Sequence, residues 1–287
     1  MRQIKMNRFV VAGLAATLLF GAVACGSSDS SGSKGGGTSG GGSGSGSSEA
    51  VKSLDDLTGK TIGVQTGTTG ETYANENKPE GAKIKSFEDT TGLFGALESG
   101  DIDAVLQDLP VNAGRVAEDD TVSVIETFKT DEQYGFAVEK GNALKDDLDK
   151  ALAAVRDDGT YDALYEKYFP TDGAEPGPGP DASDVKGGET LKVCSDIPYP
   201  PMEFEGEGPR GLQYTGFDIE LLDAMAVSMD MKLEILDVGF DGILGNLASG
   251  TCDVVGSSLT ITEERKQEVD FTEPYFDADQ SLLVKVG

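Results

Sequence analysis

Apolar and polar positions along this chain follow two patterns: short uninterrupted apolar runs, and longer stretches in which apolar residues recur every three or four positions. The short runs are typical of buried parallel strands. They occur at Thr61–Val64, Ile102–Leu106, Leu191–Cys194, Lys232–Leu236 and Cys252–Gly256. The longer stretches predict helices at Leu144–Val155 and Asp218–Met229. Strands and helices that alternate in this way predict an α/β fold.

One pattern occurs twice in the chain. Gly95–Val105 reads GALESGDIDAV and Gly245–Val255 reads GNLASGTCDVV, with six of eleven positions identical. Each reads as the end of a helix, a glycine stop and a buried strand. The repeat predicts two α/β lobes of similar design, with a chance likeness of helix–glycine–strand connections as the alternative.

The first residues read as an export signal. Three basic residues precede an apolar run from Phe9 to Ala24, which is too short to span a membrane. Small residues and then Cys25 end the run and resemble a bacterial lipobox. We therefore expect residues 1–25 to be a lipoprotein signal peptide whose Cys25 carries the lipid. Ordinary secretion with an incidental cysteine is the alternative.

Two stretches have the composition of linkers. Residues 26–50 are mostly glycine and serine and cannot bury enough apolar surface to fold, so we expect a flexible tether. Residues 171–188 contain a Pro-Gly-Pro-Gly-Pro run and predict a second linker. This linker separates two folded segments, residues 51–170 and residues 189–287.

Composition excludes several classes of protein. The 287 residues carry a formal net charge of −28, with 51 acidic against 23 basic residues, so we expect no nucleic-acid partner. The sequence has no histidine, which excludes His-based triads and His zinc sites. Three cysteines are too few for a disulfide scaffold or a four-cysteine metal site. We expect an acidic protein without metal or cofactor that binds a small molecule.

Candidate site residues follow the predicted strands, because ligands of open α/β sheets bind beyond the carboxyl ends of the strands. After Thr61–Val64, the chain passes Thr68 and Thr69 before a predicted helix. Such a helix start suits a carboxylate. The loop lacks the Lys-Ser/Thr pair of a P-loop and the full dinucleotide fingerprint. An ordinary capped helix start is the alternative.

Charged and aromatic residues follow other strands. Arg265 lies in the first turn of a predicted helix, where its charge opposes the helix dipole. An anion held bidentately would explain it, and a solvated surface arginine is the alternative. Asp108, at a strand end, is either a partner for an ammonium group or a helix cap. Tyr199 and Phe240 either line an apolar slot or belong to the core.

The motifs of both segments resemble one known family. The later segment contains TLKVCSDIPYPPMEF, TGFDIELLDAM and SLTITEER, and it resembles the first half of the bacterial extracellular solute-binding proteins of family 3, which bind amino acids. The earlier segment contains SLDDLTGKTIGVQTGTTGETYANE, LQDLPVN and DGTYDALYEKYFP, and it resembles the second half. Together the two resemblances cover nearly all of the chain outside the linkers.

The resemblance implies a two-lobed clamshell of the periplasmic-binding-protein type (type II), with its halves in permuted order. Residues 189–287 would form the family's first lobe and residues 51–133 its second lobe, while residues 134–170 would cross and return as helices to the first lobe. Natural rearrangement and engineering would leave the same order. Because one covalent crossing is then cut, we expect Ser281–Val286 to pair with the crossing near Thr127–Val138.

The resemblance also implies ligand contacts. Arg265 would bind the α-carboxylate of an amino acid, and Asp108 would bind its α-ammonium group. Thr68 and Thr69 match positions of the second lobe that contact the α-carboxylate, and Ser258 and Thr260 match positions that contact the backbone of the amino acid. The positions that match the side-chain pocket are Asp196, Tyr199, Phe240 and Gln65. Carboxylate and amide groups in the side-chain pocket favour a polar or basic L-amino acid, with a small neutral one as the alternative.

Such a protein would be a monomeric, lipid-anchored receptor outside the cytoplasm that delivers an amino acid to an ABC permease. The alternatives are a sensor or binding domain without transport, a dehydratase-like enzyme on the same scaffold, and a rearranged chain that binds nothing. We expect no enzyme, because Asp108 and Arg265 match ligand clamps and histidine is lacking. Cys194 and Cys252 lie on strands expected to be neighbours, where a disulfide would fit this location if the register allows it.

Overall fold

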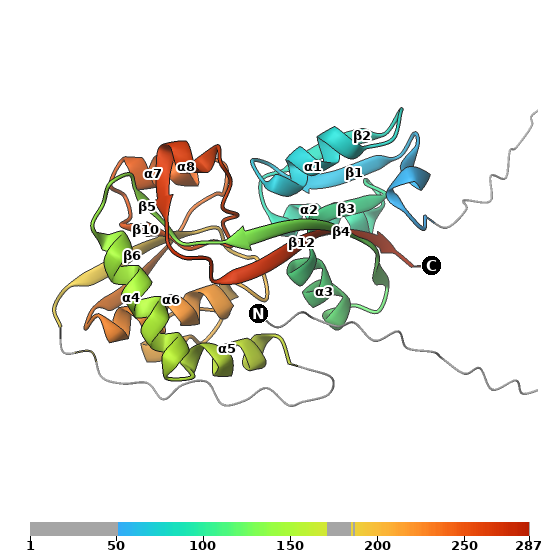
Figure 1. The fold of residues 1–287 in the computed structure, drawn as a ribbon. Coiled ribbons are helices and arrows are strands. Elements are labelled where there is room, and N and C mark those ends of the chain that lie inside the picture. The colour runs from blue at the N-terminus through green and yellow to red at the C-terminus, as the bar shows by residue number, and fades with distance from the viewer. Residues whose placement is uncertain (1–50, 171–184, 186, 287) are drawn as a thin grey trace, which may run out of the picture. The chain divides into compact units, whose positions relative to one another are not determined.

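A computed structural model describes residues 51–170, 185 and 187–286, all within one compact unit. The predicted signal peptide with Cys25, the tether at residues 26–50 and most of the Pro/Gly linker lie outside the described residues. The described chain forms two lobes, each built on a five-stranded sheet (Figure 1). The predicted α/β class and its two lobes are confirmed.

Lobe A is built on the sheet β2-β1-β3-β12-β4. Strands β1, β2 and β3 run parallel, whereas β12 runs antiparallel to both β3 and β4. Its elements are the short helix Leu54–Leu57, β1 (Thr61–Gln65), α1 (Thr69–Asn77), β2 (Lys83–Phe87), α2 (Thr90–Ser99), β3 (Ala104–Asp108), α3 (Leu109–Glu118), β4 (Val122–Tyr134) and β12 (Phe276–Lys285). Strand β12 therefore comes from the segment expected to form the other lobe.

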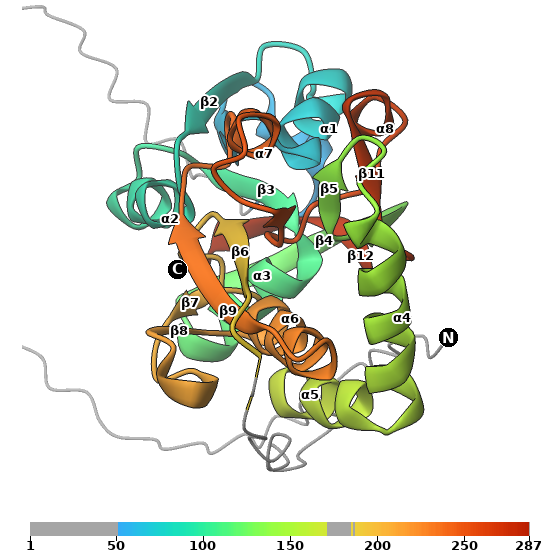
Figure 2. The same ribbon diagram turned by 90° about the vertical axis from the view of Figure 1, so that its left-hand side faces the viewer.

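Lobe B is built on the sheet β11-β5-β10-β6-β9, in which β6 runs parallel to β9 and β10. Helices α4, α5 and α6 pack together on one face and α7 lies on the other (Figure 2). Its elements are β5 (Ala137–Glu139), α4 (Leu144–Asp157), α5 (Thr160–Tyr168), β6 (Thr190–Ser195), the pair β7 (Phe204–Glu205) and β8 (Tyr214–Thr215) with a short helix at Pro209–Gly211 between them, α6 (Phe217–Ser228), β9 (Lys232–Asp237), α7 (Ile243–Ala248), β10 (Val254–Val255), α8 (Arg265–Glu268) and β11 (Val269–Phe271).

The apolar runs become strands because helices cover both faces of each sheet. In β3, Leu106 packs into one apolar cluster of lobe A and its neighbour Val105 into another. In β12, Leu282 and Leu283 divide between the same two clusters. Successive side chains of a strand point to opposite faces, so a strand buried on both faces needs an unbroken apolar run. Each of the five predicted strands and both predicted helices overlaps an element of the structure.

The repeated sequence pattern has the same structural role in both lobes. Gly100 after α2 and Gly250 after α7 take left-handed φ angles of 80° and 73°, which glycine adopts at no steric cost. The aspartate three residues later accepts a backbone N–H from a neighbouring strand: Asp103 from Thr61 at 2.8 Å, and Asp253 from Lys192 at 2.9 Å. Glycine ends the helix, and aspartate aligns two parallel strands.

Two long strands, β4 and β12, run between the lobes (Figure 1). They pair antiparallel from Phe276 opposite Tyr134 to Lys285 opposite Val122. The C-terminal strand pairs with the crossing strand as expected, but the expected partner residues were wrong beyond Ser281. Ser281 lies opposite Thr127, and the residues after it pair with residues 122–126, whereas residues 276–280 pair with residues 128–134. Near Asp279 the register shifts, and the Asp279 carboxylate accepts the N–H of Thr130 at 3.0 Å.

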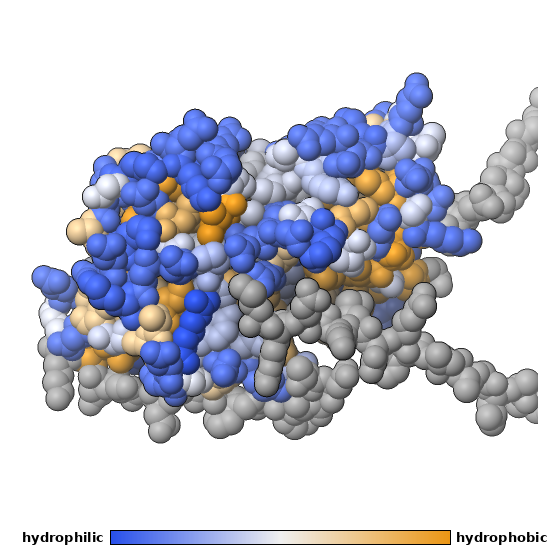
Figure 3. Space-filling view, in the orientation of Figure 1, coloured by the Kyte–Doolittle hydropathy of each residue, from blue (hydrophilic) through white to orange (hydrophobic). Residues whose placement is uncertain are grey.

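Hydrophilic side chains cover α1 in lobe A and α4 and α8 in lobe B on the face drawn in Figure 3, with smaller apolar areas between them. Among the described residues, Val286 is the one large apolar side chain that is exposed, at 43%. The surface therefore agrees with the strongly acidic composition of the chain.

Candidate functional site

A cleft with about 290 Å³ of empty space brings together residues of both lobes. Lobe A contributes Gln65, Thr68, Thr69 and Asp108, and lobe B contributes Asp196, Tyr199, Glu203, Phe240, Ser257, Ser258, Thr260 and Arg265. All ten residues named from the sequence as ligand contacts lie on this one cleft. Glu203 and Ser257 are additional.

Lobe A supplies its residues from the ends of two neighbouring parallel strands. Strand β1 ends at Gln65 and β3 ends at Asp108. Gly67 takes a left-handed φ of 78°, which turns the chain into α1 with Thr68 as its N-cap. The Thr68 hydroxyl accepts the N–H of Glu71 at 3.1 Å and donates to the carbonyl of Gln65 at 2.8 Å. That hydroxyl is therefore engaged in the helix cap.

Lobe B holds its serines in a strained turn after β10. Ser258 has a φ of 47°, a left-handed value that is uncommon for residues other than glycine. Its N–H donates to the carboxylate of Asp218 at 2.7 Å, and the hydroxyl of Tyr275 donates to the same oxygen at 2.6 Å. Asp218 is fully buried in α6. This buried carboxylate fixes the turn that presents Ser258 to the cleft.

Arg265 reaches from lobe B to lobe A. Its guanidinium donates to the carbonyl of Thr260 at 2.8 Å and to the carbonyl of Gly67, in lobe A, at 3.1 Å. It also lies 5.5 Å from the centre of the Phe240 ring. Burial lowers the pKa of Arg265, but an arginine remains charged. A guanidinium has five N–H donors, so this one can still bind an anion.

Asp108 lies in the N-cap position of α3 but makes no side-chain capping bond. Its carboxylate instead accepts hydrogen bonds from the hydroxyl of Tyr134 and from Nε2 of Gln280. Burial, and then the nearby charge of Glu132, raise the pKa of Asp108 to about 6. A carboxyl group in this state favours a cation as its partner, because a cation would offset both effects.

Two more carboxyl groups line the lobe B wall. Asp196 accepts a hydrogen bond from Nε2 of Gln65 across the cleft at 2.6 Å, and its own N–H donates to Oγ of Ser257 at 2.9 Å. Burial raises the pKa of Asp196 to about 6. Glu203 accepts from the hydroxyls of Ser257 at 3.0 Å and Ser258 at 3.3 Å. Burial, and then the charge of Asp218, raise the pKa of Glu203 well above its ordinary value.

The charges of the cleft are unbalanced. Arg265 faces three carboxyl groups, those of Asp108, Asp196 and Glu203. None of these four side chains forms an ion pair with another described residue. The cleft is therefore suited to a small molecule that brings one anionic group and more than one cationic group.

A signal for Glu203 is present in the sequence. It is a charged residue between Met202 and Phe204, in the same loop as Tyr199. A carboxylate within an apolar run is buried only if it has partners, and the serines supply them. Ser257 directly precedes Ser258, and its position gives no separate signal.

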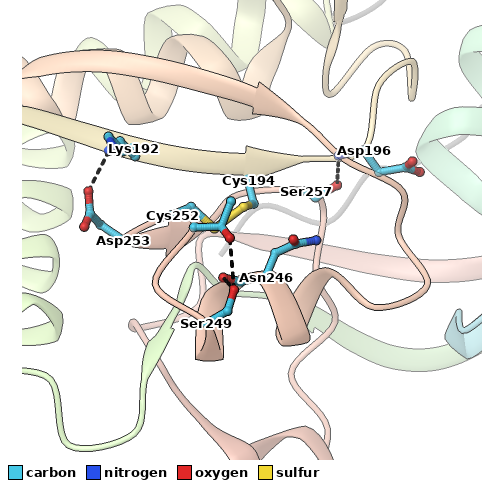
Figure 4. The surroundings of a disulfide bond; sticks show 9 residues. Lys192, Cys194, Asp196, Asn246, Ser249, Cys252, Asp253 and Ser257 are labelled. Atoms are coloured by element: carbon cyan, nitrogen blue, oxygen red, sulfur yellow. Dashed lines mark hydrogen bonds between the residues drawn. A yellow bond between two sulfur atoms is a disulfide. The ribbon is translucent and has the colours of Figure 1, made fainter.

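A disulfide joins Cys194, in β6, to Cys252, just before β10 (Figure 4). Its Cα atoms are 5.7 Å apart. Asp196 and Ser257 follow these two strands and are hydrogen-bonded to each other. The disulfide therefore ties together the two strands whose ends carry Asp196 and the serines.

The described part of the chain contains no group of three or more His, Cys, Asp and Glu side chains that could hold a metal ion. None of the helices within residues 51–170 and 187–286 is long and apolar enough to cross a membrane.

Fold and site together define a two-lobed binding protein, with α/β lobes joined by crossing strands and a polar cleft formed by both. The sequence profile of the bacterial extracellular solute-binding proteins, family 3, matches residues 78–171 and 191–287, which is more than half of the chain. The chain belongs to this family.

Individual relatives match shorter stretches. A probable histidine-binding protein of Neisseria gonorrhoeae is 37% identical over 100 residues, which are 35% of this chain and 36% of that protein. The ABC transporter arginine-binding protein 1 of Escherichia coli K12 is 35% identical over 128 residues, which are 42% of this chain and 52% of that protein. An ancestral arginine-binding protein, solved with arginine, is 46% identical over 30% of this chain and 37% of its own, with a TM-score of 0.28. The chain thus spans about a quarter to a half of the length of the curated relatives it matches.

Proposed function

We propose that this protein captures a basic L-amino acid between its lobes and delivers it to the permease of an ABC transporter. The excess of carboxyl groups over cations in the cleft carries this proposal. The α-carboxylate would pair with Arg265 and the α-ammonium group with Asp108, and both are charge-assisted contacts. Asp196 and Glu203 would then lie near the side chain of the ligand. A guanidinium or ammonium group there would favour the ionised form of these two carboxyl groups, whose pKa values burial raises.

The proposal includes closure of the lobes. Arg265 belongs to lobe B and Asp108 to lobe A, so one amino acid that touches both joins the lobes. Contacts between the described residues already join the lobes, among them Arg265 to Gly67, Gln65 to Asp196, and the hydroxyl of Thr90 to the carbonyl of Pro198. A ligand that binds the closed arrangement more tightly than the open one shifts the population towards it.

The printed names of relatives support an amino acid as the ligand. Family members similar to parts of this chain are named as binding proteins for histidine, arginine and L-cystine. Histidine and arginine carry nitrogen-rich side chains that suit the carboxyl groups of the lobe B wall.

Thermal unfolding with each common L-amino acid tests the proposal. A ligand that binds only the folded state raises the unfolding midpoint by mass action. We expect the largest rise with arginine, lysine or ornithine, and its loss in Arg265→Ala and Asp108→Ala. Arg115→Ala is the matched control, because Arg115 pairs with Asp119 on α3 and does not line the cleft. A rise with glutamine alone would contradict a basic ligand, and no rise with any amino acid would refute the function.

We also infer that the chain is a circular permutant of its family. The family profile matches two stretches separated by the Pro/Gly linker. Leu54 donates its N–H to Glu126, which pairs with Leu282 of β12, so both ends of the described fold meet on lobe A (Figure 1). On this inference residues 51–133 form the family's second lobe, completed by β12 from the end of the chain, and residues 189–275 form its first lobe together with the returning residues 134–170. A chain rejoined as residues 189–286 followed by 51–170 should bind somewhat more tightly, and equal affinity and midpoint would refute a cost of permutation.

The proposed location is the outer face of the cell membrane, through a lipid on Cys25. The disulfide between Cys194 and Cys252 supports a compartment outside the reducing cytoplasm. Labelled fatty acid should be incorporated into the protein in bacteria and not into a Cys25→Ala variant. Equal labelling of both would refute the anchor.

A further inference from the structure

Glu132, on the crossing strand β4, accepts hydrogen bonds from hydroxyl groups of both lobes. Its Oε2 accepts from the hydroxyl of Thr69, at the start of α1 in lobe A, at 2.6 Å. The same oxygen accepts from the hydroxyl of Thr260, in lobe B, at 2.9 Å. Both threonines line the cleft, whereas Glu132 lies behind them. One carboxylate oxygen thus sets the orientation of two hydroxyl groups from opposite walls.

A hydroxyl group has one proton and two lone pairs. Because the protons of Thr69 and Thr260 point to Glu132, their oxygens can only accept hydrogen bonds on the cleft side. The two oxygens are 3.4 Å apart. Such a pair repels a carboxylate and attracts an N–H group.

The hydroxyl oxygen of Thr69 lies near the carboxylate of Asp108. Nε2 of Gln280, on β12, lies 3.4 Å from the Thr69 hydroxyl oxygen and 3.0 Å from Oε1 of Glu132, and it also donates to Asp108. The Thr69 hydroxyl and the Asp108 carboxylate therefore lie within reach of one nitrogen atom. An ammonium group has three N–H donors, which the Asp108 carboxylate and the two hydroxyl oxygens can match.

We propose that Glu132 is a positioning residue that turns the Thr69 and Thr260 hydroxyls into acceptors for the α-ammonium group of the ligand. This inference rests on the proposed function and changes one expected contact. The resemblance assigns Thr69 to the α-carboxylate, but its hydroxyl has no proton to donate. The α-carboxylate would then be bound by Arg265 and by backbone N–H groups at the start of α1, which lack partners within the helix.

A comparison of two ligands that differ only in the α-amino group tests this role. The probes are L-arginine and δ-guanidinovaleric acid, with L-lysine and ε-aminocaproic acid as a second pair, and titration calorimetry on the purified protein gives the affinities. In Glu132→Ala, the preference for the amino acid over its deaminated partner should fall about tenfold or more, since charge-assisted contacts are lost. Affinity for the deaminated partner should change less than threefold.

Glu126→Gln is the matched control. Glu126 lies on the same strand and also accepts a hydrogen bond, from the N–H of Leu54 at 2.7 Å, but outside the cleft. This variant should keep the wild-type preference. A Glu132→Gln variant adds a second measurement, since its amide group would face the donor Gln280 or the two hydroxyls and should reduce the preference as well.

Three outcomes would overturn the inference. If Glu132→Ala weakens both probes of a pair equally, Glu132 has only a structural role. If it strengthens L-arginine binding, Glu132 competes with the ligand carboxylate. If the wild type binds no basic amino acid, the proposed function itself fails, and the inference with it. The first two results, obtained with a wild type that binds, leave the proposed function intact.

Discussion

The disulfide between Cys194 and Cys252 should contribute a large part of the stability of this protein. It closes a loop with a sequence separation of 58 residues, which contains the β7–β8 pair, α6, β9 and α7 of lobe B. Chain entropy for a loop of that length corresponds to about 4 kcal/mol at 25 °C. For a domain of this size each kcal/mol shifts the midpoint by about 2–4 °C, so reduction should lower it by about 8–16 °C.

Thermal unfolding with and without a reductant measures this effect. The double variant Cys194→Ala and Cys252→Ala should unfold near the midpoint of the reduced wild type and should not respond to reductant. Both cysteines are buried in one apolar cluster of lobe B, so the reduced wild type retains packing that the variant loses. Comparing the two separates the cross-link from the packing of the sulfur atoms.

Two results would refute this reasoning. A wild-type midpoint that changes by less than about 2 °C on complete reduction would mean that the unfolded chain is not restrained as the entropy calculation assumes. A double variant that still responds to reductant would mean that the reductant acts elsewhere.

Three further predictions concern packing, charge and selectivity. A Cβ atom on Gly256 would lie 2.2 Å from Cδ1 of the buried Leu222, so Gly256→Ala should lower the free energy of unfolding, measured by chemical denaturation, by about 1–3 kcal/mol. Gly245 has open space around it, so Gly245→Ala should be neutral or stabilising, and equal effects of the two variants would contradict the packing argument. Burial raises the pKa of Asp196 from 3.8 to about 6, so the folded state binds the proton of this carboxyl group more tightly than the unfolded state does. As the pH rises from about 4 to 6, the wild type without ligand should therefore lose up to about 3 kcal/mol of stability relative to Asp196→Asn, and a constant difference in stability across that range would refute the prediction. Asp196→Asn should also lower the affinity for basic amino acids, measured by calorimetry, about tenfold or more and should change the affinity for neutral ones little. Equal losses of affinity for both classes would mean that Asp196 does not recognise the side chain of the ligand.

Much of the fold and the site could be predicted from local patterns. Apolar runs such as Leu191–Cys194 identify strands buried on both faces, and the repeated glycine and aspartate mark the same helix–strand connection in each lobe. All ten candidate residues follow strand ends or motifs, and the cleft collects them because parallel strands deliver their carboxyl ends to one edge of a sheet.

The remaining features depend on contacts between distant segments. Glu132 and Gln280 lie on separate crossing strands, 148 residues apart, and only the pairing of these strands brings them behind the cleft. The burial of Glu203 depends on two serines more than 50 residues later in the chain. The left-handed backbone of Ser258 depends on Asp218 in α6. No local pattern contains these pairings, so sequence alone does not predict them.

Strand β12 has a consequence for the order in which the molecule can form. The sheet of lobe A is complete only after residues 276–285 have been synthesised, because β12 lies between β3 and β4. Asp108 and its partner Gln280 are 172 residues apart, so a ribosome makes most of the chain between them. Until then β3 and β4 have unpaired edges, which are sites of misassociation. During synthesis the sheet of lobe A can therefore be completed only after β11, the last strand of lobe B, has been made.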